Sequence, residues 1–190
     1  MSVSFDSLRS ELKETLYEAG QCLHYWRCYN TPETVEPNIE AMNRFPWFFQ
    51  IARRAFLNTA LIDLCKLHER RPDSLSLHTL LRSAEGLSLA QPERLLEAEQ
   101  SLKLAAPIHQ KVRILRNKVF AHRNVNRDRD EWFTQAAVSP NALFELHEIS
   151  KQIFNHISSA YDRSSNSFSL EGPQQFEQLL AALRNPNRAT

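Results

Sequence analysis

The chain has 190 residues, of which only 3 are glycine, and its 23 lysine and arginine residues nearly balance 22 aspartate and glutamate residues. Hydrophobic residues make up 42% and charged residues 24%. These proportions are typical of a soluble globular protein and exclude the collagen-like, disordered and disulfide-scaffold classes. With 3 glycines and no G-x-G-x-x-G or Walker-type run, the sequence also excludes a fold that binds nucleotides through glycine-rich loops.

Apolar residues recur every three or four positions near the start of the chain, which predicts a first helix that ends near Asn30. That apolar stripe consists of Leu8, Leu12, Leu16, Ala19, Leu23 and Trp26. Pro32 and Pro37 then interrupt the pattern. A second long helix follows, in which Pro46 marks either the first turn or a kink.

Prolines also mark the expected helix boundaries in the rest of the chain. After a short helix, Pro92 opens a fourth helix, and Pro107 either starts a fifth helix or kinks the fourth. Residues 123–138 are polar and predict an irregular segment. Ser139 and Pro140 are typical of an N-cap followed by the first helical position, so they predict the start of another long helix.

No segment alternates apolar and polar residues as a strand does, so we expect an all-α fold, a bundle of about five to six helices. Residues 1–165 are expected to form the helical domain, and residues 166–190 a linker and a C-terminal helix packed on it. No apolar run approaches the roughly 18 residues of a membrane span, and the N-terminus lacks a signal-peptide layout. We therefore expect a cytoplasmic protein with no membrane partner.

The near-neutral total charge hides a local concentration of positive charge. Residues 111–127 contain six basic side chains and no acidic one, so the remainder of the chain is five units negative. The basic side chains are Lys111, Arg113, Arg116, Lys118, Arg123 and Arg127. Such a patch predicts a surface that binds the phosphate backbone of a nucleic acid. The alternative is a solvent-exposed helix face beside a charged loop.

Three residues in this basic patch have the chemistry for cleaving RNA without a metal. Arg116 offers a planar, permanently charged guanidinium to phosphate oxygens, and His122 can exchange a proton near neutral pH. Asn117 can donate and accept hydrogen bonds that orient a ribose hydroxyl or the imidazole. One group would move protons while another stabilises the phosphorane, so we expect no metal or other cofactor.

Helical geometry limits how these residues can act together. Six residues turn a helix by about 600°, which leaves Arg116 and His122 roughly 120° apart. Both would therefore not converge well on one phosphate within a single chain. His122 continues an apolar stripe, which is either part of the core or a seam between two copies of the chain. The stripe consists of Ile108, Val112, Leu115 and Val119.

The segment LRNKVFAH, in a helix of an all-α domain of this size, resembles the HEPN superfamily, whose hallmark is Arg, a polar residue, and His four to six positions after the Arg. The longer layout, with LIDLCKL in the second helix and SLSLHTLL before the next, is similar to the abortive-infection branch. The resemblance implies a metal-independent endoribonuclease, usually a homodimer with a composite site at the interface. It also implies toxin or antiphage activity, RNA as partner, and a product that ends in a cyclic phosphate.

The resemblance assigns roles to the motif and leaves one alternative. Arg116 would bind and stabilise the scissile phosphate, His122 would transfer protons, and Asn117 would position one or both. A cognate antitoxin protein is a further expected partner, although Asn124 stands where relatives modified by a nucleotidyltransferase antitoxin carry tyrosine. The alternative is a non-catalytic HEPN-type module that binds RNA, a nucleotide or another protein.

Two further residues are candidates for supporting the site. His109 shares a helical stripe with Arg113 and Arg116, so it can join them. Asp63 falls on or near an apolar face of the second helix, and a buried carboxylate there would need a partner such as Arg116 or Arg113. A solvent-facing aspartate is the alternative.

Overall fold

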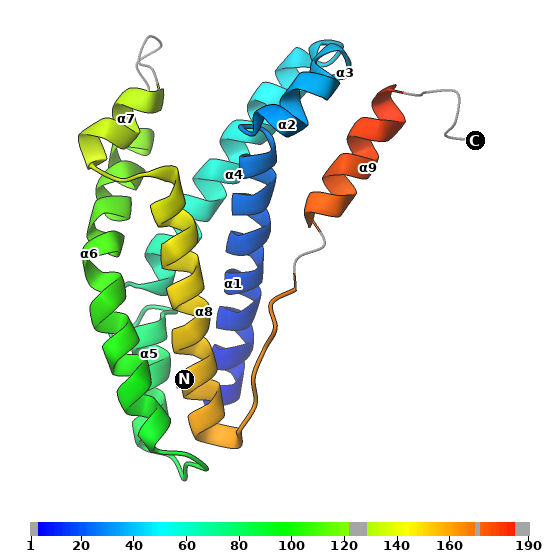
Figure 1. Cartoon of the computed structure of the whole chain (residues 1–190). Coiled ribbons are helices and arrows are strands. Elements are labelled where there is room, and N and C mark those ends of the chain that lie inside the picture. The colour runs from blue at the N-terminus through cyan, green and yellow to red at the C-terminus, as the bar shows by residue number, and fades with distance from the viewer. Residues whose placement is uncertain (1–3, 122–128, 170–171, 185–190) are drawn as a thin grey trace.

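Four long helices build the protein, as a computed structural model shows for residues 4–121, 129–169 and 172–184 (Figure 1). These helices are α1 (Phe5–Cys28), α4 (Pro46–Leu67), α6 (Glu93–Ala121) and α8 (Pro140–Asp162). The shorter helical segments are α2 (Pro32–Val35), the 3-10 turn η1 (Glu36–Asn38), α3 (Ile39–Asn43), α5 (Leu77–Glu85), α7 (Arg129–Ala136) and α9 (Gly172–Arg184). The described ranges contain no strand, which confirms the all-α prediction.

The expected number of five to six helices is too low. The segment around Pro32 and Pro37 was predicted only to break the chain, yet its prolines occupy first-turn positions of α2 and η1, where a missing N–H costs nothing. Residues 129–136 form α7 where an irregular segment was predicted. Pro107 starts no new helix, since it lies inside the continuous helix α6.

The predicted helix starts agree well with the structure. Ser139 caps α8 by accepting a hydrogen bond from the Ala142 backbone N–H at 3.2 Å, with Pro140 at the first helical position. Pro46 likewise begins α4 rather than kinking it. At the end of α8, Arg163 takes a left-handed conformation with φ of 62°, which stops the helix.

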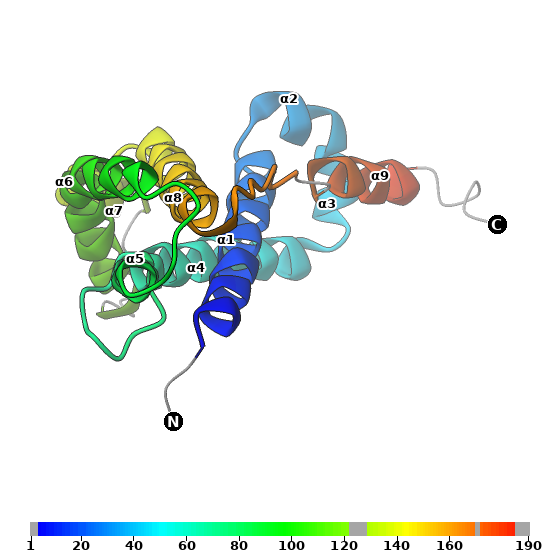
Figure 2. The same ribbon diagram turned by 90° about the horizontal axis from the view of Figure 1, so that it is seen from below.

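The core lies between α1, α4, α6 and α8. The predicted stripe of the first helix is buried along its whole length, from Leu8 to Trp26. Figure 2 shows α6 and α8 side by side, with α4 and α5 below them and α1 between α8 and α9. On α6, Val112 and Leu115 are fully buried in this same core. The stripe that was a candidate dimer seam is therefore part of the core of each chain at these positions.

Helix α9 packs on the outside of α1 and α3. Its Phe176 and Leu180 are buried against Tyr29 of the α1 end and Phe49 of α4. The Tyr29 and Phe176 rings lie with centroids 4.7 Å apart. The C-terminal helix is thus held by a small aromatic cluster that is separate from the main core.

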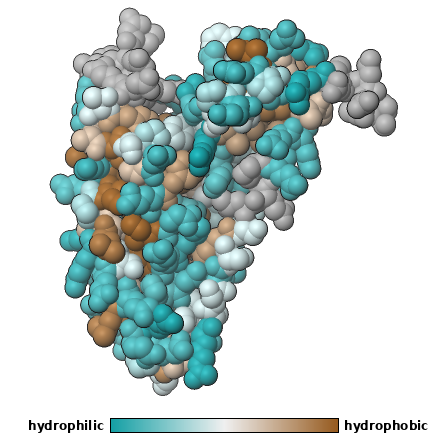
Figure 3. All heavy atoms as spheres, viewed as in Figure 1, coloured by the Kyte–Doolittle hydropathy of each residue, from teal (hydrophilic) through white to brown (hydrophobic). Residues whose placement is uncertain are grey.

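The large exposed apolar side chains include two groups. One group, Trp47, Phe48 and Ile51, lies at the start of α4, and the other, Leu96, Leu104 and Ile114, lies on the outer face of α6. Figure 3 shows hydrophobic atoms reaching the surface on the α6 side of the molecule. Among the described residues, no helix has both the length and the apolar character of a membrane span.

Two leucines of this bundle give a matched test of the core. Leu64 of α4 is fully buried, whereas Leu179 of α9 is 43% exposed. We expect Leu64→Ala to lower the free energy of unfolding by about 2–5 kcal/mol, because it removes buried methyl groups and leaves a cavity. Leu179→Ala, which lies outside the core, should change it by about 0.5 kcal/mol or less. Urea unfolding of both variants measures this, and equal losses would contradict the described packing.

Candidate functional site

A cavity of about 650 Å³ lies along one flank of α6, facing the C-terminal end of α4, the loop after it and α5. Its walls carry three arginines and three histidines but only one carboxylate. The lining residues are Cys65, His68, Glu69, Arg70, His78, Leu102, Ala106, Pro107, His109, Gln110, Arg113 and Arg116. This composition favours a negatively charged ligand.

Helix α6 contributes His109, Arg113 and Arg116 to the cavity. These residues are four and three positions apart, so they share one face of the helix, as the sequence predicted. Arg116 donates from Nε and Nη2 to Oδ1 of Asn117, at 3.2 and 3.0 Å. The guanidinium of Arg116 is thereby oriented by the neighbouring residue of the motif.

The arginines of the cavity are not neutralised by carboxylates. In the part of the chain that the structure describes, no ion pair joins an acidic side chain to Arg70, Arg113 or Arg116. A guanidinium presents five N–H donors in a planar fork that matches phosphate oxygens. The unpaired charges at the cavity are therefore available to a phosphate.

His68 is fixed in one tautomer by α8. The hydroxyl of Ser150 donates to the backbone carbonyl of Leu146 at 2.6 Å, because a carbonyl can only accept. The hydroxyl has one hydrogen, so at its 2.7 Å contact with Nε2 of His68 it accepts. Nε2 of His68 therefore carries the proton, and its Nδ1 keeps the lone pair in the neutral ring.

His109 lies beside His68, with ring centroids 5.4 Å apart and planes inclined by 30°. Burial, followed by the neighbouring His109 and His78, lowers the pKa of His68 to about 3. Burial, followed by Arg113 and then His78, Arg116 and Arg70, lowers the pKa of His109 to about 4. Both imidazoles are therefore neutral at pH 7.

The Cys65 thiol of the cavity is not activated as a nucleophile. Burial raises the pKa of the Cys65 thiol to about 11, although Arg116 and Arg113 act in the opposite direction. The thiol is therefore protonated at neutral pH and a poor nucleophile. Within the described ranges, no three His, Cys, Asp or Glu side chains are arranged to hold a metal ion.

The other predicted phosphate-binding residues lie elsewhere or cannot be placed. Lys111 is exposed on α6 and is not among the residues that line the cavity. Lys118 donates from Nζ to Oε1 of Gln135 on α7, at 2.7 Å. His122, Arg123 and Arg127 lie outside the described residues.

Asp63 is buried, as one of the two alternatives predicted, but the expected arginine partner is wrong. Its Oδ1 is 3.7 Å from Nζ of Lys66, one turn further along α4. Burial raises its pKa, while Lys66 lowers it and Glu18 of α1 raises it further. Burial, followed by Asp63, raises the pKa of Cys22, another α1 residue, to about 11. The carboxylate therefore faces α1 instead of the cavity, because α4 buries this side against α1.

Sequence reasoning missed the wall of the cavity that the C-terminal end of α4, the loop after it and α5 provide. His68, Arg70 and His78 line this wall, and Ser150 supports it from α8. Ser150 is 34 residues from Arg116 in the sequence, and no spacing rule connects the two. His68 did carry a signal, since it continues the buried stripe of Leu57, Leu61 and Leu64 by one further helical turn.

The all-α bundle, with its Arg-Asn pair at the end of a long helix, agrees with the family match, and the chain is a HEPN-type domain of the abortive-infection class. More specifically, residues 3–178 match the family described as AbiU2 (HEPN_AbiU2), and the chain belongs to that family. No curated protein and no solved structure matches the chain.

The buried histidine makes stability depend on pH in a defined direction. The pKa of His68 is about 3 in the folded chain and near 6.5 in the unfolded one, so only the unfolded chain binds this proton as the pH falls through that window. Stability is therefore complete above pH 6.5 and falls by up to about 1.4 kcal/mol per pH unit below it, for this group.

We expect His68→Gln to make the free energy of unfolding less dependent on pH between pH 6.5 and 4, because glutamine does not titrate. The glutamine amide can still donate a hydrogen bond to Ser150. Urea unfolding of wild type and variant across this range measures the two slopes. A comparison at pH 8, where the imidazole is neutral in both states, separates the packing cost. Identical slopes in the two proteins would contradict the assigned burial of a neutral His68.

Proposed function

We propose that this protein is a metal-independent endoribonuclease of the toxin or antiphage abortive-infection type. It would cleave RNA by attack of the ribose 2′-hydroxyl on the adjacent phosphate, at a composite site in a cytoplasmic homodimer. Membership of the AbiU2 family supports the abortive-infection role. The observation that carries the chemistry is the cavity in which Arg113 and Arg116 present guanidiniums without carboxylate partners. A toxin of this kind requires control, so a cognate antitoxin protein is part of the proposal.

Each residue of the motif and of the basic patch has a proposed role that follows from its chemistry. Arg116, oriented by Asn117, binds the scissile phosphate and stabilises the charge that develops on its oxygens in the transition state. His122 transfers protons. Single-stranded or looped RNA is the expected substrate, because its ribose can align for in-line attack. The remaining basic side chains of the patch hold the RNA backbone, namely Lys111, Arg113, Lys118, Arg123 and Arg127.

We place the dimer seam on the outer face of α6. This choice follows from two facts: the inner stripe of α6 is occupied by the core of the chain, and the outer face exposes Leu96, Leu104 and Ile114. Ile114 lies one helical turn before Asn117 of the motif, so a two-fold axis near Ile114 brings the Asn117 side chains of two copies close together. Arg116 lies about 200° from Ile114 around α6 and lines the cavity of its own chain.

Cleavage of RNA in the presence of EDTA tests the proposed activity. We expect wild-type protein to cut unstructured RNA, and Arg116→Ala and His122→Ala each to slow cleavage by about 100-fold or more, because each removes a group that acts in the transition state. Arg54→Ala, which changes an exposed arginine of α4 outside the cavity, is the matched control.

The outcomes separate the two candidate functions. Full activity in the His122→Ala variant would overturn the assignment of the motif. Binding of RNA that Arg116→Ala weakens, with no cleavage by any protein, would establish the non-catalytic binding module instead. Growth arrest on overexpression, relieved by His122→Ala, is the corresponding observation in cells.

The dimer seam is tested separately. We expect wild-type protein to be a dimer in light scattering and the double variant Leu104→Glu with Ile114→Glu to be a monomer with greatly reduced cleavage, because buried carboxylates would oppose association. Leu179→Glu, on the exposed side of α9, is the control and should remain a dimer. A wild-type monomer, or a double variant that remains a dimer, would contradict the proposed seam.

A further inference from the structure

The proposed reaction requires two proton transfers, one from the attacking 2′-hydroxyl and one to the departing 5′-oxygen. In the motif, His122 is the only histidine and serves one of these transfers at a time. Arginine stays protonated at neutral pH and is a poor base. A second proton-transfer group near Arg116 would complete the chemistry, and the cavity contains one.

His109 has the position that this role requires. It lines the same cavity as Arg113 and Arg116 and lies on their face of α6, one turn before Arg113. Side chains three or four positions apart on a helix have Cβ atoms about 5–6 Å apart. A phosphate bound between the two guanidiniums therefore lies next to the imidazole of His109, together with the ribose attached to that phosphate.

The ring that lies beside His109 is itself held in place. The ring of His68 lies 5.4 Å away at 30°, and Nε2 of His68 is itself bonded to Ser150 at 2.7 Å. Ser150 is fully buried and bonded to the backbone of α8. Ser150 of α8 thus contacts His68 at the end of α4, and His68 lies beside His109 of α6.

Charged and titratable groups face His109 from every element around the cavity. Arg113 and Arg116 lie on its own helix, His68 at the C-cap of α4, Arg70 and Glu69 on the loop that follows, and His78 on α5. Burial and the guanidiniums lower the pKa of His109 to about 4, so its ring has a free lone pair at neutral pH. An anionic phosphate offsets the same guanidinium charges, and therefore raises this pKa when substrate binds.

We propose that His109 accepts the proton of the attacking 2′-hydroxyl, and that His68, held by Ser150, positions it. The 2′-oxygen forms a bond to phosphorus, and the bond between phosphorus and the 5′-oxygen breaks. The 2′-hydroxyl proton passes to the imidazole of His109, and the 5′-oxygen takes a proton from His122. The products are a 2′,3′-cyclic phosphate and a 5′-hydroxyl. This inference rests on the proposed ribonuclease function.

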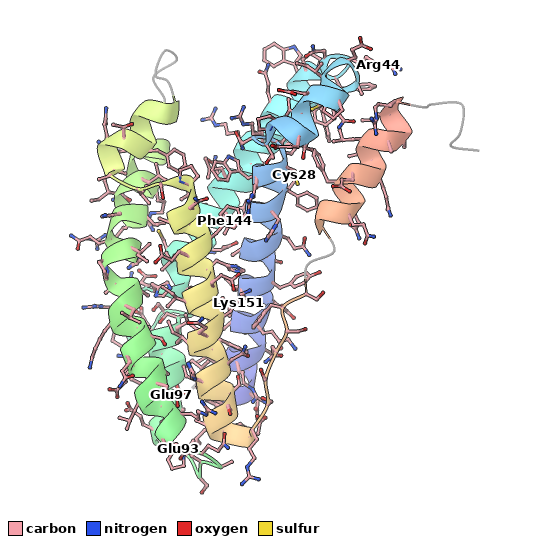
Figure 4. The ribbon with its side chains drawn as sticks, in the orientation of Figure 1. Cys28, Arg44, Glu93, Glu97, Phe144 and Lys151 are labelled. Carbon is pink, nitrogen blue, oxygen red and sulfur yellow. The ribbon has the colours of Figure 1, made fainter. Side chains whose placement is uncertain are left out.

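The test uses the full chain and two RNA ligands of the same sequence, one natural and one with 2′-deoxyribose throughout, which binds but cannot react. Single-turnover cleavage of the first and fluorescence anisotropy with the second are measured for wild type, His109→Gln, His109→Ala and His156→Gln. His156 is the control because it pairs with Glu97 at 2.9 Å, and Glu97 is about 18 Å from His109 along α6. Figure 4 shows Glu97 near the end of α6 that is remote from the motif.

We expect both His109 variants to cleave about 100-fold more slowly or worse, with affinity for the deoxy ligand within about threefold of wild type. His156→Gln should behave as wild type. Added imidazole should partly restore the rate of His109→Ala, which a purely structural role of His109 would not allow. Thermal unfolding followed by circular dichroism confirms that each variant is folded. If His109→Ala is unfolded, the cleavage rate of His109→Gln is used instead.

The results that overturn this inference differ from those that overturn the ribonuclease function. If wild type cleaves and both folded His109 variants cleave within threefold of it, His109 is not the proton acceptor, while the proposed function stands. If His109→Ala is slow and imidazole has no effect at any concentration, its role is structural. If wild type does not cleave the natural RNA at all, both the function and this inference are wrong.

Discussion

The orientation of α6 depends on the burial of its inner stripe, and the site depends on that orientation. Val112 and Leu115 are fully buried between α6 and the helices α4 and α8. Because a helix turns by about 100° per residue, fixing these two side chains in the core also fixes the direction of every other side chain on α6. His109, Arg113 and Arg116 are thereby turned toward the flank that faces α4 and α5, where the cavity lies. Leu104 and Ile114 are turned outward by the same constraint.

The proposed phosphate site in this protein with only 3 glycines rests on side chains. Glycine-rich loops bind phosphates through backbone N–H groups, whereas here guanidiniums from a rigid helix and the adjoining loop face the cavity. Burial keeps His68 and His109 neutral beside these cations. The cavity thus combines fixed positive charge with neutral imidazoles, which suits the proposed metal-free cleavage of RNA.

Much of the fold follows from local sequence signals. The apolar stripe of α1, the serine cap of α8 and the proline starts of α4 and α8 were all predicted correctly, because these signals act within a few residues. The short helices α2 and α7 were missed, since short segments depend on tertiary contacts more than on pattern. Phe133 of α7, for instance, stacks on Trp26 with ring centroids 5.9 Å apart.

The candidate site was only partly predictable, because it joins elements that are distant in the sequence. The common face of His109, Arg113 and Arg116 follows from helical spacing alone. The partner of Asp63 was assigned wrongly, since which side of α4 meets α1 is a property of the packed bundle. The contribution of Ser150 follows from the packing of α8 on the other helices, which no motif encodes.

The chemistry of the RNA fragments tests the central claim most directly. Mass spectrometry of the fragments formed in EDTA identifies both new ends of each cut. Attack by the 2′-hydroxyl at a site made of Arg116 and imidazoles predicts a 2′,3′-cyclic phosphate on one fragment and a 5′-hydroxyl on the other. Fragments with a 3′-hydroxyl and a 5′-phosphate would show that water attacked instead, and would contradict this account.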